Sequence, residues 1–132
     1  MIFVDSDTFI GIIAPQDAHH ARATLIFDRF SKTQDELVTS WETIDEVATK
    51  LSKYFGKDIA RTFFHFLAHT QITVVYVDKI LAGVAITIFD QQTSKNISLT
   101  DCANIAICRS LKIDTMFSFD EHFKKNGLKL LS

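Results

Sequence analysis

Cysteine, proline and glycine are scarce in this chain of 132 residues, which has two, one and four of them. The two cysteines, Cys102 and Cys108, lie in an apolar stretch at a spacing that fits neither a disulfide framework nor a zinc site. Because there is also no Ser- or Pro-rich linker and no internal repeat, we expect residues 1–132 to form a single domain. Reduced cysteines suit a cytoplasmic location.

Long hydrophobic runs and an excess of one charge are missing as well. The apolar runs, of which 72–77 is typical, are far shorter than the roughly 18–20 residues of a membrane span, so we expect no membrane association. Lysine and arginine number 14 against 16 aspartates and glutamates, a net charge of −2. A protein that binds nucleic acid through bulk electrostatics is strongly basic, so nucleic-acid binding by this chain requires another source of attraction.

Apolar residues make up 47% of the chain, and their spacing predicts alternating strands and helices. Strands are predicted over residues 1–4, 37–40, 72–77, 115–119 and 128–131. Helices are predicted over residues 17–30, 41–55, 57–70, 80–89 and 99–111. The continuous β-branched run at 72–77 is typical of a strand buried on both faces. This alternation predicts an α/β fold, a three-layer α/β/α sandwich with a mostly parallel sheet.

Carboxylates recur where the predicted strands end and where helices begin. Asp5 and Asp120 each follow a predicted strand directly, and Asp101 opens a predicted helix. Three more acids occupy the first turns of the helix at 41–55, and helical spacing alone does not choose among Glu42, Asp45 and Glu46. Because ligands of open α/β sheets bind beyond the carboxyl ends of the strands, we expect acids from four elements to meet at one edge of the sheet.

Each acid also has an ordinary structural explanation. Ser98 and Asp101 match the spacing of a helix capping box. Glu46, beside Lys50 and Lys53, fits a solvated helix face, and acids at strand ends fit turns and helix starts. The joint pattern favours a cation site, because converging like charges repel one another unless protons or cations neutralise them.

The donor set of this cluster indicates the kind of ion. Carboxylates without cysteine or suitably spaced histidine suit Mg²⁺ or Mn²⁺ rather than zinc. Such an ion activates water and holds the oxygens of a phosphodiester during in-line displacement. The acids therefore point to metal-dependent nuclease chemistry.

The same segments carry a resemblance to a known family. In order along the chain they are IFVDSD at 2–7, TSWETIDEV at 39–47, SLTDC at 98–102 and TMFSFDEHF at 115–123. They resemble the acidic motifs of PIN-domain ribonucleases, and within these the VapC-like toxins of prokaryotic toxin–antitoxin pairs. The resemblance spans essentially the whole chain and selects Glu46 as the second acid. The chain departs from it at Asp7, where a small or uncharged residue is usual, and at Asn96, where many relatives carry an acid.

The resemblance implies roles for particular residues. Four acids would be catalytic and bind one or two Mg²⁺ or Mn²⁺ ions that activate water for attack on an RNA phosphate: Asp5, Glu46, Asp101 and Asp120. Polar neighbours would support these carboxylates by hydrogen bonds: Ser6, Ser40 and Ser118, with Asp7 joining or crowding the site. Ser118 is the best placed of the serines, because it shares a strand face with Asp120.

The remaining expectations concern RNA and protein partners. The C-terminal third is locally basic and offers phosphate contacts at Arg109, Lys124 and Lys125. The resemblance implies an RNA substrate, an antitoxin partner and a homodimer.

Three other functions fit parts of the sequence. A PIN fold without catalysis would act as a binding or scaffold module, although the presence of all four acids argues against it. A small haloacid-dehalogenase-like phosphatase would use the DSD at 5–7 as its DxD motif, but Phe9 stands where that family has Thr or Val, and 132 residues leave no room for a cap domain. A receiver-like domain lacks its early acidic pair.

Overall fold

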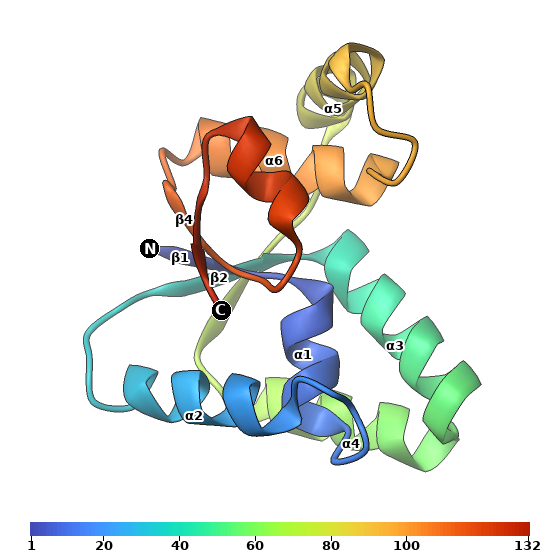
Figure 1. The fold of residues 1–132 in the computed structure, drawn as a ribbon, viewed down its shortest axis with the longest axis vertical. Helices are drawn as coiled ribbons and strands as arrows, with labels where there is room; N and C mark the ends of the chain where they lie inside the picture. The colour runs from blue at the N-terminus through green and yellow to red at the C-terminus, as the bar shows by residue number, and fades with distance from the viewer.

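The computed structural model describes all 132 residues, and at its centre lies a five-stranded sheet in which every strand is parallel (Figure 1). The strands are β1 (Ile2–Val4), β2 (Leu37–Ser40), β3 (Ile72–Val75), β4 (Thr115–Phe117) and β5 (Lys129–Leu131). The helices are α1 (Ser6–Ile13), α2 (His20–Phe30), α3 (Trp41–Phe55), α4 (Lys57–Ala68), α5 (Lys79–Gln91), α6 (Leu99–Ser110) and the 3-10 helix η1 (Glu121–Asn126). The predicted α/β/α sandwich is confirmed.

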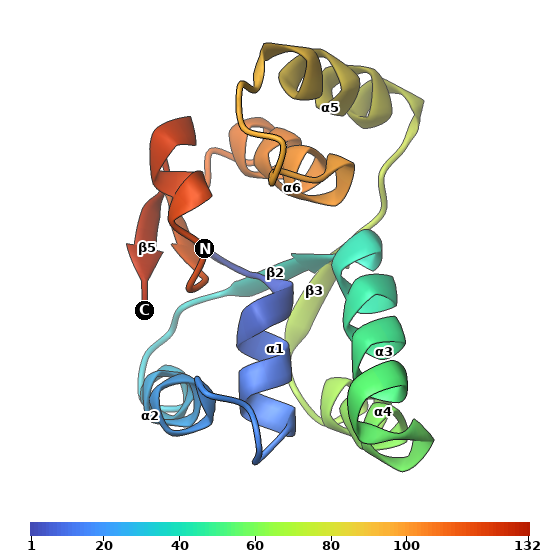
Figure 2. The same ribbon diagram turned by 45° about the vertical axis from the view of Figure 1, so that its right-hand side comes forward.

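Helices cover both faces of the sheet and enclose a separate core on each face. Figure 2 shows α5 and α6 on one side and α1 to α4 on the other. Ile2 and Val4 of β1 enter the core beneath α1 to α4, whereas Phe3 enters the core beneath α5 and α6. Since side chains alternate along a strand, a register slip of one residue would exchange the two faces.

The order of the strands determines where a ligand site is expected. The sheet runs β3-β2-β1-β4-β5, so the chain leaves β1 toward β2 and β3 and later returns to the other side of β1 as β4. The carboxyl ends of β1 and β4 therefore form the topological switch point, where open α/β sheets bind their ligands. Asp5 follows β1 at this point, and Ser118 follows β4.

Two features differ from the sequence predictions. Helix α1 was not predicted, because its apolar residues run on without the polar face that marks an amphipathic helix. The segment at 72–77 is not buried on both faces: β3 ends at Val75, pairs only with β2 at the edge of the sheet, and has partly or fully exposed side chains. None of the helices combines the length and apolar character needed to cross a membrane.

A fully buried hydrogen-bond network joins α3 to α6. The Ser40 hydroxyl caps α3 by accepting the Thr43 backbone N–H at 3.0 Å and donates to Asn104 Oδ1 at 2.7 Å. The Asn104 amide nitrogen donates to Thr43 Oγ1 at 2.9 Å. Ser40 therefore holds two helices together and does not bond to a carboxylate, contrary to the expectation from the sequence.

We predict that Asn104→Ala lowers the free energy of unfolding by about 2 kcal/mol, because it leaves the buried Ser40 hydroxyl without its acceptor. Urea denaturation followed by circular dichroism measures the change. Asn96→Ala is the matched control at an exposed position, with an expected change within ~0.5 kcal/mol. Equal stability of the two variants would contradict the structural role of the network.

Candidate metal centre

Asp5 is the most deeply buried acid of the chain, with 3% of its surface exposed. Its Oδ2 accepts a hydrogen bond from the Ser118 hydroxyl at 2.9 Å, whereas its Oδ1 is buried without any partner. Burial, reinforced by the charges of Asp7 and Asp101, raises the pKa of Asp5 well above its ordinary value. An unpartnered buried carboxylate oxygen is rare in a folded protein and marks a place where a cation fits.

Asp101 both caps α6 and belongs to the same acidic cluster. Its Oδ2 accepts the Ser98 backbone N–H at 2.8 Å, and the Ser98 hydroxyl accepts the Asp101 N–H at 3.1 Å, so the predicted capping box is present. Burial raises the pKa of Asp101, and the charges of Glu46 and Asp120 add to the effect. The structural and the functional explanations of this residue are therefore compatible.

Asp120 lies just after β4 and is held by a histidine that sequence patterns did not single out. Its Oδ1 accepts from the His122 backbone N–H at 2.9 Å and lies 2.5 Å from the His122 ring Nδ1. The Nε2 of the same ring lies 3.3 Å from the Ser94 hydroxyl in the segment between α5 and α6. His122 thus links Asp120 to the segment between α5 and α6.

The structure distinguishes among the three acids at the start of α3. Asp45 is exposed. Glu42 has one buried, unpartnered oxygen but lines a small, mainly apolar pocket between α5 and α6. Glu46 Oε1 pairs with Lys50 Nζ at 2.7 Å, while its Oε2 is buried without a partner. Although partial burial opposes the effect, the pair with Glu46 and the charges of Asp5 and Asp101 raise the pKa of Lys50.

A common pattern unites the four acids named by the resemblance. One oxygen of each is engaged by a local donor, and the other has no protein partner: Asp5 Oδ1, Glu46 Oε2, Asp101 Oδ1 and Asp120 Oδ2. Oxygen-only donors of this kind suit Mg²⁺ or Mn²⁺. No three acidic, histidine or cysteine side chains are already close enough together to hold an ion.

Asp7 lies among these acids but differs from them. Its Oδ2 accepts the Phe119 backbone N–H at 2.9 Å, and its Oδ1 lies 3.3 Å from the Thr8 hydroxyl, so both oxygens are engaged. Burial raises the pKa of Asp7, with a further contribution from Asp120. Its contacts tie the first turn of α1 to the segment after β4, which is a supporting role.

The other predicted site residues lie at varying distances from the cluster. Ser6 is buried at the start of α1, and its hydroxyl forms no hydrogen bond with an acid. Arg109 is exposed near the far end of α6, about 12 Å of helix from Asp101, and so does not lie beside the acids. Lys124 pairs with Glu121 at 2.8 Å on η1, and Lys125 is exposed.

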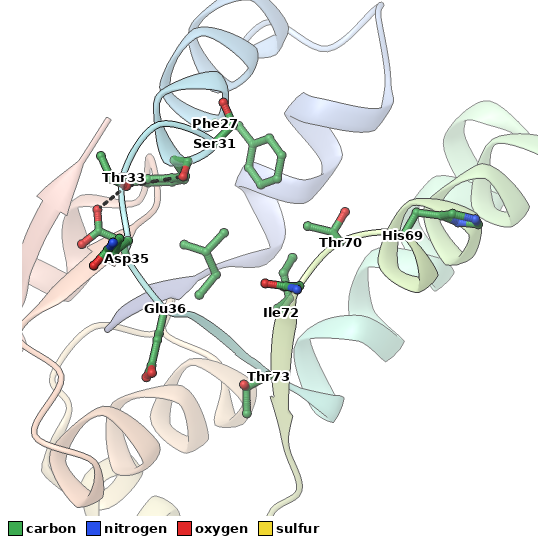
Figure 3. Close-up of a pocket in the computed structure, with 13 residues that line it drawn as sticks. Phe27, Ser31, Thr33, Asp35, Glu36, His69, Thr70, Ile72 and Thr73 are labelled. Atoms are coloured by element: carbon green, nitrogen blue, oxygen red, sulfur yellow. Dashed lines mark hydrogen bonds between the residues drawn. The ribbon is translucent and has the colours of Figure 1, made fainter.

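A pocket of about 770 Å³ lies at the opposite edge of the sheet (Figure 3). It is lined by residues from the end of α2, the start of β2 and the start of β3, including Phe27, Asp35, Glu36 and His69. Asp35 accepts a hydrogen bond from the Thr33 hydroxyl at 2.7 Å (Figure 3). None of the clustered acids lines this pocket, which is therefore separate from the candidate metal centre.

Comparison with known proteins identifies the family. The PIN domain family model matches residues 2–128. The chain belongs to the PIN-domain family. No curated protein matches this PIN domain significantly. The comparisons give no support to the phosphatase or receiver alternatives.

Three solved structures illustrate the fold that this chain shares with known proteins. VapC20 of Mycobacterium tuberculosis, described as a sarcin–ricin loop cleaving toxin, has a TM-score of 0.88 and 22% identity over 98% of this chain and 97% of its own. FitAcB of Neisseria gonorrhoeae has a TM-score of 0.70 and 16% identity, over 100% and 97% of the chains. VapBC2 of Rickettsia felis, bound to a DNA fragment from its promoter, has a TM-score of 0.69 and 13% identity, over 99% and 98%.

We predict that Asp5→Asn stabilises the metal-free PIN domain at pH 7.5. A carboxyl group whose pKa is raised in the folded state favours folding at low pH, and this contribution is lost as the pH rises through the folded-state pKa. Removing the buried charge should raise the Tm in EDTA by on the order of 4 °C, the shift given by about 1 kcal/mol in a chain of this size. Differential scanning calorimetry between pH 5 and 8 measures it, and the gain should shrink toward pH 5.

Asp114→Asn is the control for this effect, because the exposed Asp114 has a pKa lowered by its hydrogen bond with Lys129. Its neutral variant should not gain stability at pH 7.5. An Asp5→Asn protein with a Tm equal to or below that of the wild type would show that burial of the charge carries no penalty.

Proposed function

We propose that this PIN domain is a metal-dependent endoribonuclease that hydrolyses RNA phosphodiester bonds. Asp5, Glu46, Asp101 and Asp120 would bind Mg²⁺ or Mn²⁺, as one or two ions. The observation that carries the proposal is the set of carboxylates from four elements, each with one oxygen held by the protein and one left without a partner.

The protein groups around the acids have distinct tasks in this mechanism. A bound divalent ion activates water and neutralises charge on the attacked phosphate. Ser118 fixes Asp5 through Oδ2 and leaves Oδ1 directed to the site. Ser98 likewise bonds to one oxygen of Asp101, and His122 to one oxygen of Asp120. Asp7 keeps the segment that carries Asp120 against α1. Such supporting contacts orient the carboxylates before the ion arrives.

We further propose that the enzyme is the toxin of a toxin–antitoxin pair. The fold it shares with VapC20, a toxin that cleaves the sarcin–ricin loop, and with VapBC2 supports this proposal. An antitoxin partner and a homodimer both require apolar surface. Large apolar side chains are exposed on α3, α4 and α5 and beside them, at Trp41, Tyr54, Phe64, Tyr76, Ile80, Ile86 and Phe89.

The electrostatics of the proposed reaction explain how a chain of net charge −2 binds RNA. Two divalent ions would neutralise the four carboxylates of the acidic cluster and bring the net charge of the protein to about +2, so that the site would no longer repel a phosphate. RNA binding should therefore depend more on divalent metal than on basic surface residues.

We predict that Glu46→Gln lowers the rate of Mg²⁺-dependent RNA cleavage by about 100-fold or more, because an amide is a poor ligand for this ion. Cleavage of two labelled RNAs, one containing a sarcin–ricin loop and one unstructured, measures the rate by gel electrophoresis. EDTA should abolish cleavage by the wild-type protein.

Asp45→Asn is the matched control, one position away on the same helix and exposed. It should cut at the wild-type rate. Equal cleavage by Glu46→Gln and the wild type would show that Glu46 is not a ligand. A wild-type protein that binds Mn²⁺ but cuts neither RNA would favour a non-catalytic binding module.

A further inference from the structure

Lys50 is the one lysine or arginine that forms an ion pair with an acid of the cluster. The other lysine and arginine ion pairs lie on exposed parts of the surface, at Arg61–Asp58, Lys124–Glu121 and Lys129–Asp114. Lys50 follows Glu46 by one turn of α3, and its Nζ lies 2.7 Å from Glu46 Oε1. The sequence alone assigns both residues to a solvated helix face, but the fold brings that face against the acids.

The ammonium group of Lys50 neutralises part of the negative charge that a divalent ion would neutralise. Up to five negative charges gather here, and Lys50 is the nearest permanent positive charge. Half of its side chain, 46%, remains exposed, so it can move without unpacking the core. A divalent ion on Glu46 Oε2 would lie on the same carboxylate as the ammonium, and two cations at such short range repel each other.

We propose that Lys50 is the internal counter-ion of the acidic cluster and that it competes with the divalent ion for the Glu46 carboxylate. This inference rests on the proposed function, since it assigns the metal to the same acids. In the metal-free protein Lys50 lowers the repulsion among the carboxylates. When the divalent ion binds, the ion pair between Lys50 and Glu46 breaks.

Once displaced from Glu46, the Lys50 ammonium could also contact the RNA substrate. It carries three N–H donors, lies one helical turn from Glu46, and is partly exposed to solvent. An RNA phosphate that binds the divalent ion would place an anionic oxygen within reach of the Lys50 ammonium. Lys50, rather than the distant Arg109, is then the basic residue that positions RNA phosphate beside the acids.

The two roles change metal binding and RNA binding in opposite directions. Lys50→Met keeps the length of the side chain and removes its charge, so Mn²⁺ should bind more tightly while RNA binds more weakly. We expect the Kd for Mn²⁺ to fall on the order of tenfold at low salt, with a smaller gain in 0.5 M NaCl because salt screens the repulsion. Isothermal titration calorimetry with MnCl₂ alone measures this without any substrate.

Lys53→Met is the matched control on the same helix. Lys53 Nζ lies 5.5 Å from the centre of the Tyr54 ring and pairs with no acid. Its Kd for Mn²⁺ should equal that of the wild type. Lys50→Arg, which retains the charge, should also bind Mn²⁺ with the wild-type affinity, and Lys50→Gln should behave like Lys50→Met if the methionine variant folds poorly by circular dichroism.

Cleavage kinetics at saturating Mn²⁺ test the second role. Loss of a phosphate contact made before the chemical step should raise KM several-fold for Lys50→Met with little change in kcat. Unchanged KM would remove the phosphate contact from the proposal.

Unchanged Mn²⁺ binding by Lys50→Met would overturn the counter-ion role, and weaker binding would overturn it and show that Lys50 orients Glu46 for the ion instead. If the wild type binds Mn²⁺ but cuts no RNA, the nuclease proposal fails while the comparison of Lys50→Met with Lys53→Met still decides the role of Lys50. If the wild type binds no Mn²⁺, both proposals fail.

Discussion

The burial of several carboxylates close together is the constraint on which the rest of this structure depends. Burial raises the pKa values of Asp5, Asp7 and Asp101, and the charges of neighbouring acids add to the effect. Such a cluster weakens the metal-free fold, so its persistence requires compensation. The compensation comes from nearby donors. Four acids keep one oxygen each on a partner, namely Ser118, Ser98, His122 or Lys50, whereas Asp7 has both oxygens near donors.

The topology of the sheet is what brings these acids together. Because all strands are parallel, the helices that follow β1 and β2 and the crossover helix before β4 all begin at the same edge. The N-terminal turns of α1, α3 and α6 therefore surround the cluster, and their partial positive charge favours anionic side chains. The buried link between Ser40 and Asn104 holds α3 to α6, the helices that carry Glu46 and Asp101.

How much the sequence could predict depended on the range of the interactions involved. Strands, most helices and the positions of Asp5 and Asp120 followed from local patterns, because a strand end and the acid after it are neighbours in sequence. Helix α1 was missed because its apolar run has no polar face. The partner of Ser40 lies 64 residues away, so no local pattern predicted it. The sequence placed Lys50 on a solvent-exposed helix face, because helical periodicity separates the polar from the apolar face but does not show which residues of other elements lie against the polar face. The roles of the acids as metal ligands stay predictions.

The engaged and unengaged oxygens separate the acids by function. Asp7 has both oxygens near donors, so binding an ion there would require it to release the segment that carries Asp120. The four acids of the family resemblance each retain an oxygen without a protein partner while the other fixes the orientation of the side chain. For three of them the fixing donor is neutral or, as with His122, is charged only when protonated, and it can stay in place when a cation arrives. Only Glu46 is held by a permanent cation. In the proposed metal site, its carboxylate would therefore be the point in the cluster where the protein's own charge and the divalent ion exclude each other, and the affinity for metal would be set there.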